Sequence, residues 1–183
     1  YVLYRHNAAI RFVKNWKWLD MGLNPFELPD DMEILPSLRY KLMDSYFKKN
    51  GTRGREMMRL SSGFQINLDF SSDKEGVEML RVGFYLAPLF NTLFANSPYY
   101  KGKKTGNLSE RHFVWNNTDP LRSGFLPFVF EKSFTLEKYA EHVLSVPLMY
   151  AYDKDDKVFD PKGKTLRDLT DDLAEHNAFP AMR

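Results

Sequence analysis

Residues 63–70 alternate strictly between apolar and polar side chains, and no other window constrains the fold of this chain as strongly. A period of two is that of a β-strand, whose successive side chains point to opposite faces of a sheet. The apolar members are Phe64, Ile66, Leu68 and Phe70, and the polar members are Gln65, Asn67 and Asp69. We therefore predict a strand with its apolar row toward a core and its polar row on the opposite face.

Helical patterns surround this strand. Leu38, Leu42 and Tyr46 recur at helical spacing and predict a helix that ends near Asn50. Residues 72–75, Ser-Asp-Lys-Glu, form a capping box that predicts the start of a long helix, buried on most sides by its wide apolar surface. Further helices are expected over residues 7–19, 135–144 and 165–174, further strands over 125–130 and 146–152, and an exposed loop over 100–107. Helices with segregated strands predict an α+β fold in a single domain, residues 1–183.

Charge and composition exclude several classes of function. The 26 lysines and arginines are scattered among 24 acidic residues, for a net charge of +2, which argues against nucleic-acid binding. The longest apolar region, residues 82–95, contains Gly83, Pro88 and Asn91 and does not predict a membrane span. The lack of cysteine removes thiol chemistry and disulfides, and together with the lack of a signal sequence it predicts a cytoplasmic location. Because the sequence begins at Tyr1, we expect a portion of a longer protein.

The polar row of the expected strand has two interpretations. It can be a surface face wetted by water, as in many amphipathic sheets. It can also be a binding surface, because the Gln65 and Asn67 carboxamides and the Asp69 carboxylate offer donors and acceptors in register. Such a row suits a ligand that carries phosphate, carboxylate and metal ions together.

A second group of polar residues surrounds an Asp-Pro turn in residues 115–124. Arg122 has the most specific chemistry there, because its planar guanidinium can hold a carboxylate or phosphate through two parallel bonds. The alternative is a turn capped by Thr118 or Asp119, with Arg122 as a solvated loop charge. Arg111 carries the same ambiguity. The sequence has neither a glycine-rich phosphate loop nor a histidine metal motif, so a nucleotide would need another kind of site.

The order and spacing of short motifs add a further signal. In chain order they are residues 39–43 (RYKLM), 57–58 (MM), 65–72 (QINLDFSS), 94–98 (FANSP), 115–124 (WNNTDPLRSG), 126–130 (LPFVF), 146–147 (VP) with Tyr150 and Tyr152, and 163–168 (GKTLRD). Over about residues 35–168 this series resembles the plant and proteobacterial type of glutamate–cysteine ligase. The resemblance is to a central-to-C-terminal portion of those enzymes.

The resemblance implies both a fold and a reaction. The implied fold is related to glutamine synthetase, with an antiparallel sheet as the floor of the site and helices packed against it. The implied reaction is ATP-dependent: the glutamate γ-carboxylate takes the γ-phosphoryl group, and the amine of cysteine then displaces phosphate, which is the first step of glutathione biosynthesis. The implied substrates are glutamate, cysteine and ATP, and magnesium ions would neutralise the phosphates.

The resemblance also implies roles for particular residues. Arg122 matches a catalytic arginine expected to hold the substrate carboxylate or the transferring phosphate. Gln65 matches a position that addresses a metal ion or the phosphoryl group. The other implied substrate-binding residues are Asn67 in the same ligand space, Asn96 and Arg111 in supporting or substrate roles, and Tyr150 and Tyr152 near the acceptor amino acid.

Two family motifs are missing, which keeps other functions open. The sequence has neither a Glu-x-Glu pair nor a late Leu-Glu-x-Arg motif. Because several metal-binding carboxylates are therefore lacking, we expect these 183 residues to be inactive in isolation. The alternatives are a ligase that joins glutamate to another amine, and a noncatalytic relative that serves in binding or assembly.

Overall fold

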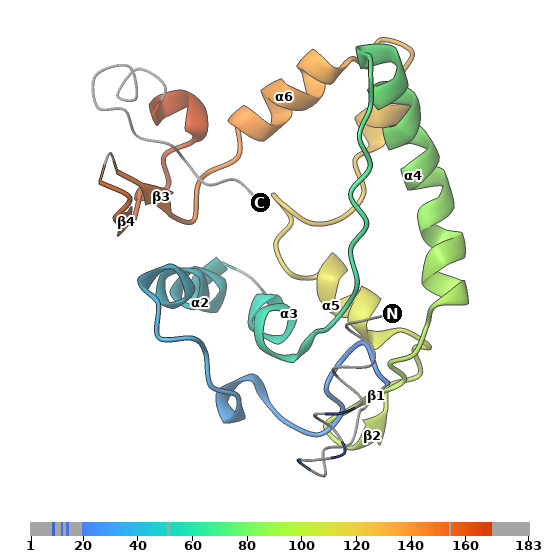
Figure 1. The fold of residues 1–183 in the computed structure, drawn as a ribbon, viewed down its shortest axis with the longest axis vertical. Helices are drawn as coiled ribbons and strands as arrows, with labels where there is room; N and C mark the ends of the chain where they lie inside the picture. The colour runs from blue at the N-terminus through green and yellow to red at the C-terminus, as the bar shows by residue number, and fades with distance from the viewer. Residues whose placement is uncertain are drawn as a thin grey trace.

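The structure is a computed structural model that describes residues 9, 12, 14, 20–50, 52–153 and 155–169. Figure 1 shows helices joined by extended chain, with short antiparallel hairpins at two sites. The described helices are η1 (Pro29–Asp31), α2 (Leu38–Asn50), α3 (Gly54–Leu60), α4 (Asp73–Leu93), α5 (Glu110–Asn116), η2 (Pro127–Phe130) and α6 (Leu136–Leu144). The described strand pairs are β1 (Tyr99–Tyr100) with β2 (Lys103–Lys104), and β3 (Ala151–Tyr152) with β4 (Val158–Phe159). The mixed helix-and-strand class is thus confirmed.

Helix α3 lies between α2 and α5 and forms the centre of the main core (Figure 1). Leu60 at its end packs with Leu23 and Val114, and all three side chains are buried. Partly buried Met32, Met57 and Tyr100 close the cluster. Because these residues come from separate parts of the sequence, their burial holds the N-terminal chain, α3, α5 and the β1–β2 hairpin together.

Chain segments cross closely beside this core. The Asn24 amide donates to the Leu60 carbonyl at 2.9 Å, and the Ser62 amide donates to the Gly22 carbonyl at 3.0 Å. The Asn96 side-chain oxygen, in turn, accepts from the Gly22 amide at 3.0 Å. Residues 22–24, 60–62 and 96 are therefore joined by hydrogen bonds, and this crossing places both the start of the extended segment 63–70 and the chain after α4.

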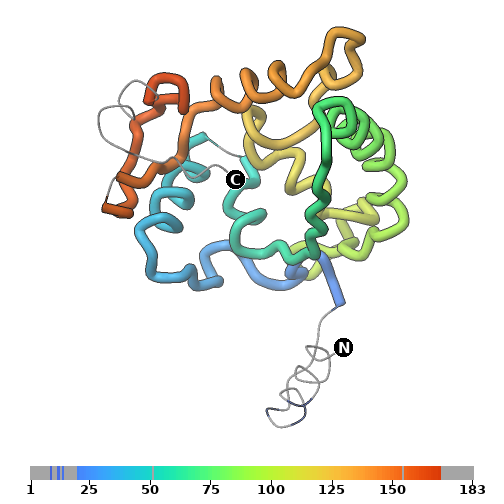
Figure 2. Tube along the Cα trace, turned by 45° about the horizontal axis from the view of Figure 1, so that its top comes forward, coloured from blue at the N-terminus to red at the C-terminus, as the bar shows by residue number. Residues whose placement is uncertain are grey.

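The alternating segment 63–70 is extended, but it belongs to neither of the described sheets. Its apolar row faces α4, which runs back beside it in Figures 1 and 2: the Phe64 and Phe94 rings meet edge to face at 5.8 Å, and Phe70 lies against Gly76. The row is nevertheless open, since Phe64 is 75% exposed. The predicted extended conformation and its two faces are therefore present, whereas the predicted sheet is absent from the described chain.

Helix α4 begins where the capping box predicted. The Ser72 hydroxyl accepts from the Glu75 amide, and the Glu75 carboxylate accepts from both the amide and the hydroxyl of Ser71. Those bonds lower the pKa of Glu75. The expectation that this helix is buried on most sides is wrong, because its apolar residues are largely exposed: Val82, Tyr85, Leu89 and Leu93.

The C-terminal half departs from the expected strands. Residues 127–130 form the 3-10 helix η2 in place of a strand, with Pro127 at its first position. The Arg81 guanidinium there binds the carbonyls of Val129 and Glu131, so these acceptors are satisfied without a neighbouring strand. In the expected strand 146–152, Pro147 forms an isolated antiparallel bridge with Thr165, and only residues 151–152 form a described strand. They pair with β4 across a turn in which the Asp153 carboxylate accepts from the amides of Asp155 and Lys157.

Local capping signals at two further helices are confirmed. Thr135 caps α6 through the Lys138 amide. Thr165 and Asp168 form a reciprocal cap at the start of residues 166–169, which are helical. The remainder of that predicted helix, residues 170–174, and nearly all of the one over 7–19 lie outside the described residues. The predicted loop over 100–107 contains the second residue of β1 and all of β2, so part of it is a hairpin. No described helix combines the length and apolar character needed to cross a membrane.

The core cluster predicts a large cost for removing one of its side chains. Leu23→Ala is expected to lower the free energy of unfolding by about 2–5 kcal/mol, since Leu23 is fully buried and its loss leaves a cavity. Leu35→Ala is the matched control, because Leu35 is exposed and its loss should change stability by less than about 0.5 kcal/mol. Urea denaturation of both variants gives the comparison; equal losses would contradict this view of the core.

Candidate functional site

Arg122 lies at the end of a tight turn built on Asp119. One oxygen of the Asp119 carboxylate accepts from the Leu121 amide at 2.9 Å, and the Ser123 amide donates to the Asp119 carbonyl at 2.8 Å. Asp119 is only 2% exposed, so its charge needs a partner. Arg122 Nη1 supplies that partner at 2.5 Å from the other carboxylate oxygen.

The Arg122 guanidinium is held from a second side by Tyr46 of α2. Arg122 Nη1 also donates to the Tyr46 hydroxyl at 2.7 Å, and the guanidinium carbon lies 4.8 Å from the centre of the Tyr46 ring. The Arg122 side chain is 16% exposed, so it is not the solvated loop charge of the alternative interpretation. The other half of that alternative is correct, because Asp119 does cap its turn.

The far edge of the same guanidinium is its Nη2 nitrogen. Arg122 Nη2 is buried and makes no hydrogen bond within the described chain. A buried charged donor without an acceptor is costly, and a carboxylate or phosphate oxygen is the acceptor best matched to it. The turn therefore holds in place a donor edge that is suited to an anion.

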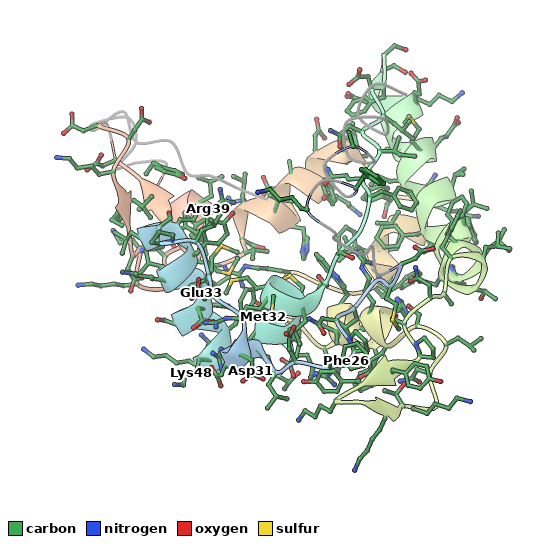
Figure 3. All side chains as sticks on the ribbon, turned by 60° about the horizontal axis from the view of Figure 1, so that its bottom comes forward. Phe26, Asp31, Met32, Glu33, Arg39 and Lys48 are labelled. Carbon is green, nitrogen blue, oxygen red and sulfur yellow. The ribbon has the colours of Figure 1, made fainter. Side chains whose placement is uncertain are left out.

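Arg39 is a second arginine on the same helix. It precedes Tyr46 by seven residues, which places both on one face of α2. Its guanidinium lies 5.1 Å from the centre of the buried Tyr150 ring, and its Nε is buried without a hydrogen-bond partner in the described part of the structure. Figure 3 shows Arg39 where α2 approaches the chain near β3. Tyr150 and Tyr152 meet edge to face at 5.9 Å, so the structure brings the two predicted acceptor-side tyrosines together beside Arg39.

Arg111 and Asn96 belong to the chain crossing beside the core. Arg111 Nε donates to the Ser62 carbonyl at 2.7 Å, and the Arg111 amide donates to the Ser97 hydroxyl at 3.1 Å. A side chain on Gly63 would lie 2.7 Å from Arg111 Nη2, so the Arg111 guanidinium would have to shift to make room for it. Burial lowers the pKa of Arg111. These contacts give Arg111 and Asn96 structural roles, and they place Arg111 at the start of the segment that carries Gln65.

Gln65 and Asn67 point to the same side of the extended segment. Gln65 Nε2 donates to the Asn67 side-chain oxygen at 2.8 Å, and the apolar row faces α4. The described residues contain no group of three or more His, Asp or Glu side chains placed to hold a metal ion. Two neutral carboxamides do not by themselves fit Mg²⁺, which is usually bound through carboxylates and phosphates. Gln65 could supply one oxygen, but the described chain does not hold a complete metal site.

Sequence reasoning missed two residues of this arrangement, Arg39 and Tyr46. Both lie on α2, whose pattern was interpreted only as a helix and, for residues 39–43, as a family motif. The sequence signal that was available is their spacing of seven, which puts an arginine and an aromatic ring on one helix face. Their partners, Tyr150 and Arg122, are far along the chain, so the pairing itself needed the structure.

Breaking the buried pair tests whether Arg122 compensates Asp119. Arg122→Ala is expected to lower the free energy of unfolding by about 3–5 kcal/mol, because it leaves the buried carboxylate unpaired. Lys138→Ala is the control: its ammonium lies 3.7 Å from Glu131, both groups are largely exposed, and its loss should cost less than about 1 kcal/mol. Urea denaturation measures both.

The double variant Asp119→Asn, Arg122→Ala completes this test. It removes the carboxylate charge together with its partner, so it should lose less stability than Arg122→Ala alone. A double variant that loses the sum of both single effects would contradict the pairing.

Comparisons with known proteins identify the family of this chain. The sequence profile of the family described as glutamate–cysteine ligase family 2 (GCS2) matches residues 14–181. The chain is 43% identical over 150 residues to the chloroplastic glutamate–cysteine ligase of Arabidopsis thaliana, a match that covers 82% of this chain and 28% of the relative. It is 41% identical over 150 residues to the chloroplastic glutamate–cysteine ligase of Brassica juncea, covering 82% of this chain and 29% of that protein.

A rice protein extends the comparison. The chain is 40% identical over 152 residues to the chloroplastic glutamate–cysteine ligase B of Oryza sativa subsp. japonica, covering 83% of this chain and 30% of the relative. The chain thus spans less than a third of the length of these relatives. The profile covers nearly the whole sequence, and these relatives are at least 40% identical to the chain. The chain therefore belongs to glutamate–cysteine ligase family 2.

Proposed function

We propose that these 183 residues are part of the catalytic domain of an ATP-dependent glutamate–cysteine ligase. The reaction joins the glutamate γ-carboxylate to the cysteine amine. A γ-carboxylate oxygen attacks the γ-phosphorus of ATP and releases ADP, and the amine then attacks the acyl carbon and releases phosphate. Family membership supports this proposal, and so do relatives that are named as glutamate–cysteine ligases.

The observation that carries the proposal is the Nη2 edge of Arg122, which has no hydrogen-bond partner in the described chain. Both the substrate and the reaction are rich in anionic oxygens, on the glutamate carboxylates and on the phosphoryl group in transfer. A guanidinium fixed by Asp119 and Tyr46, with Nη2 buried and not bonded to any described residue, is suited to hold such an oxygen without reorganising. We assign Arg122 this catalytic role.

The remaining candidate residues are assigned around that donor. Arg39 would bind a second anionic oxygen, because its Nε is buried without a hydrogen-bond partner in the described chain. Tyr150 and Tyr152 would line the side that receives the acceptor amino acid. Arg111, Asn96 and Asn67 would support the substrate, with Arg111 held against the start of the extended segment.

Magnesium and the sheet floor belong to the proposal as well. Mg²⁺ would neutralise phosphate charge when bound, with Gln65 as one oxygen ligand. Carboxylates outside the described residues would have to complete its shell. The extended segment 63–70 would be one strand of the antiparallel floor, since its backbone is extended and its polar row points away from α4.

The cellular location is a separate part of the proposal. The sequence predicted the cytoplasm, whereas the plant relatives are named as chloroplastic. We retain the cytoplasm as the proposed location and the plastid as its alternative. A fluorescent fusion of the full-length protein in its own cells separates the two.

Replacing Arg122 by lysine in the full-length protein tests the catalytic assignment. Lysine keeps the charge that compensates Asp119 but loses the planar fork, so kcat/KM for ATP-dependent phosphate release with glutamate and cysteine should fall about 100–1000-fold. Arg167→Lys, at an exposed ion pair with Glu141, is the matched control and should leave the rate nearly unchanged. An unchanged rate for Arg122→Lys would refute the role of Arg122.

Omitting or exchanging substrates tests the reaction class. Phosphate release that needs glutamate but proceeds equally with another amine would favour the alternative ligase. A full-length protein that is folded and binds neither ATP nor glutamate would favour the noncatalytic relative.

The 183 residues alone are expected to show no ligase activity, because the described part holds no complete metal site. The measurement is phosphate release by this polypeptide with ATP, Mg²⁺, glutamate and cysteine. A monodisperse, helical sample by circular dichroism is the control for folding. Turnover that depends on both amino acids would overturn this expectation.

A further inference from the structure

Tyr46 is the residue whose contacts the proposed reaction does not yet explain. It lies on α2, and its partner Arg122 lies more than seventy residues further along the chain. Its ring stacks under the Arg122 guanidinium, and its hydroxyl accepts from Arg122 Nη1. The Asp119 carboxylate accepts from the same nitrogen. Two oxygens, one from Tyr46 and one from Asp119, thus hold one nitrogen of the arginine.

We propose that Tyr46 is a positioning residue that keeps the Nη2 edge of Arg122 free for an anionic oxygen of the substrate. This inference rests on the proposed function and adds to it the reason that one edge of the guanidinium stays available. Tyr46 acts through Arg122 and does not itself touch the reacting atoms.

The division of acceptors between the two nitrogens is the first part of the argument. Nη1 faces two oxygens, those of Tyr46 and Asp119, and Nη2 faces none in the described chain. A carboxylate beside a guanidinium ordinarily prefers to bind both nitrogens in a bidentate pair. Here one Asp119 oxygen is engaged by the Leu121 amide, and the Tyr46 hydroxyl anchors Nη1 from the other side. Without that hydroxyl, Asp119 would be the only oxygen anchor of the guanidinium, which could turn so that both nitrogens face the carboxylate.

The protonation state of Tyr46 is the second part. Burial raises the pKa of the Tyr46 phenol, and the nearby charge of Arg122 opposes this only in part. The hydroxyl therefore keeps its proton across the neutral range. A neutral phenol oxygen can accept from Nη1 without adding charge, whereas a phenolate would add a second negative charge near the Asp119 carboxylate.

The anchoring of Tyr46 itself is the third part. Its ring meets the ring of Phe47 at 5.6 Å, and Phe47 is 2% exposed. Phe47 packs directly on Gly54 of α3, where any added side chain would collide with the ring at 2.2 Å. The position of Tyr46 is therefore fixed by the contact between α2 and α3, and this rigidity passes to the guanidinium.

A double-mutant cycle in the full-length ligase tests the proposal. The variants are Tyr46→Phe, Arg122→Lys and the combination, and the readouts are kcat and KM for glutamate. Phenylalanine keeps the ring under the guanidinium and removes only the hydroxyl, so kcat/KM should fall about 10–100-fold. The combined variant should lose no more than Arg122→Lys alone, and both single variants should change the same kinetic parameter. Tyr139→Phe on α6, a tyrosine outside the site, controls for the loss of a phenol hydroxyl and should be active.

The outcomes separate this inference from the proposed function. If the unmodified full-length protein shows no phosphate release with glutamate and an amine, the proposed function fails before any variant is measured. If the protein is active and the losses multiply in the combined variant, Tyr46 acts independently of Arg122 and the inference is overturned. A Tyr46→Phe enzyme with unchanged kcat and KM overturns it too.

Discussion

The crossing of chain segments beside Leu23, Leu60 and Val114 is the constraint on which the rest of the structure depends. The Ser62 amide donates a hydrogen bond to the Gly22 carbonyl, and the Arg111 side chain of α5 donates one to the Ser62 carbonyl. A side chain at position 63 would displace the Arg111 guanidinium from its present position. This one region orients the N-terminal chain, the extended segment 63–70 and helix α5, which follows the β1–β2 hairpin. The candidate residues Asn96 and Arg111 are therefore also part of the framework.

A buried negative charge sets the second constraint. Asp119 is needed to close its turn, and its burial obliges Arg122 to stay beside it. The hydrogen bond to Tyr46 then restricts the orientation in which Arg122 can pair with Asp119. A requirement of stability thus fixes the orientation of the same guanidinium that we assign to substrate. The orientation of the Arg122 guanidinium is fixed because its Nη1 nitrogen is already hydrogen-bonded to Asp119 and Tyr46.

The sequence could predict the parts of the fold that rest on local signals. The cap at Ser72, the cap at Thr135 and the spacing along α2 each involve neighbouring residues, and each element appears where it was expected. Strand pairing depends on distant partners, which explains why the alternation at 63–70 predicted an extended backbone but not its neighbours. Helices α5 and η2 were not predicted. Helix η2 depends on contacts from Arg81 that no local sequence pattern encodes.

The candidate site divides in the same way. Arg122 could be singled out by its chemistry and its motif, without knowledge of its partners. Tyr46 could not, because nothing local distinguishes it from other aromatic residues on a helix. Its role depends on a contact across the fold with Arg122. The sequence therefore indicated the residue that we propose binds the ligand, and not the residue that we propose positions it.

The open segment 63–70 has a consequence for handling this part of the protein by itself. The segment is extended, lies outside both described sheets and carries alternate apolar side chains, and such a segment is a template onto which other chains can add as strands. Asp69 is the single charge in that stretch and gives little protection against such growth. The soluble fraction of these residues in isolation should therefore fall steeply as their concentration rises. A strand paired with residues 63–70 would block the addition of other chains.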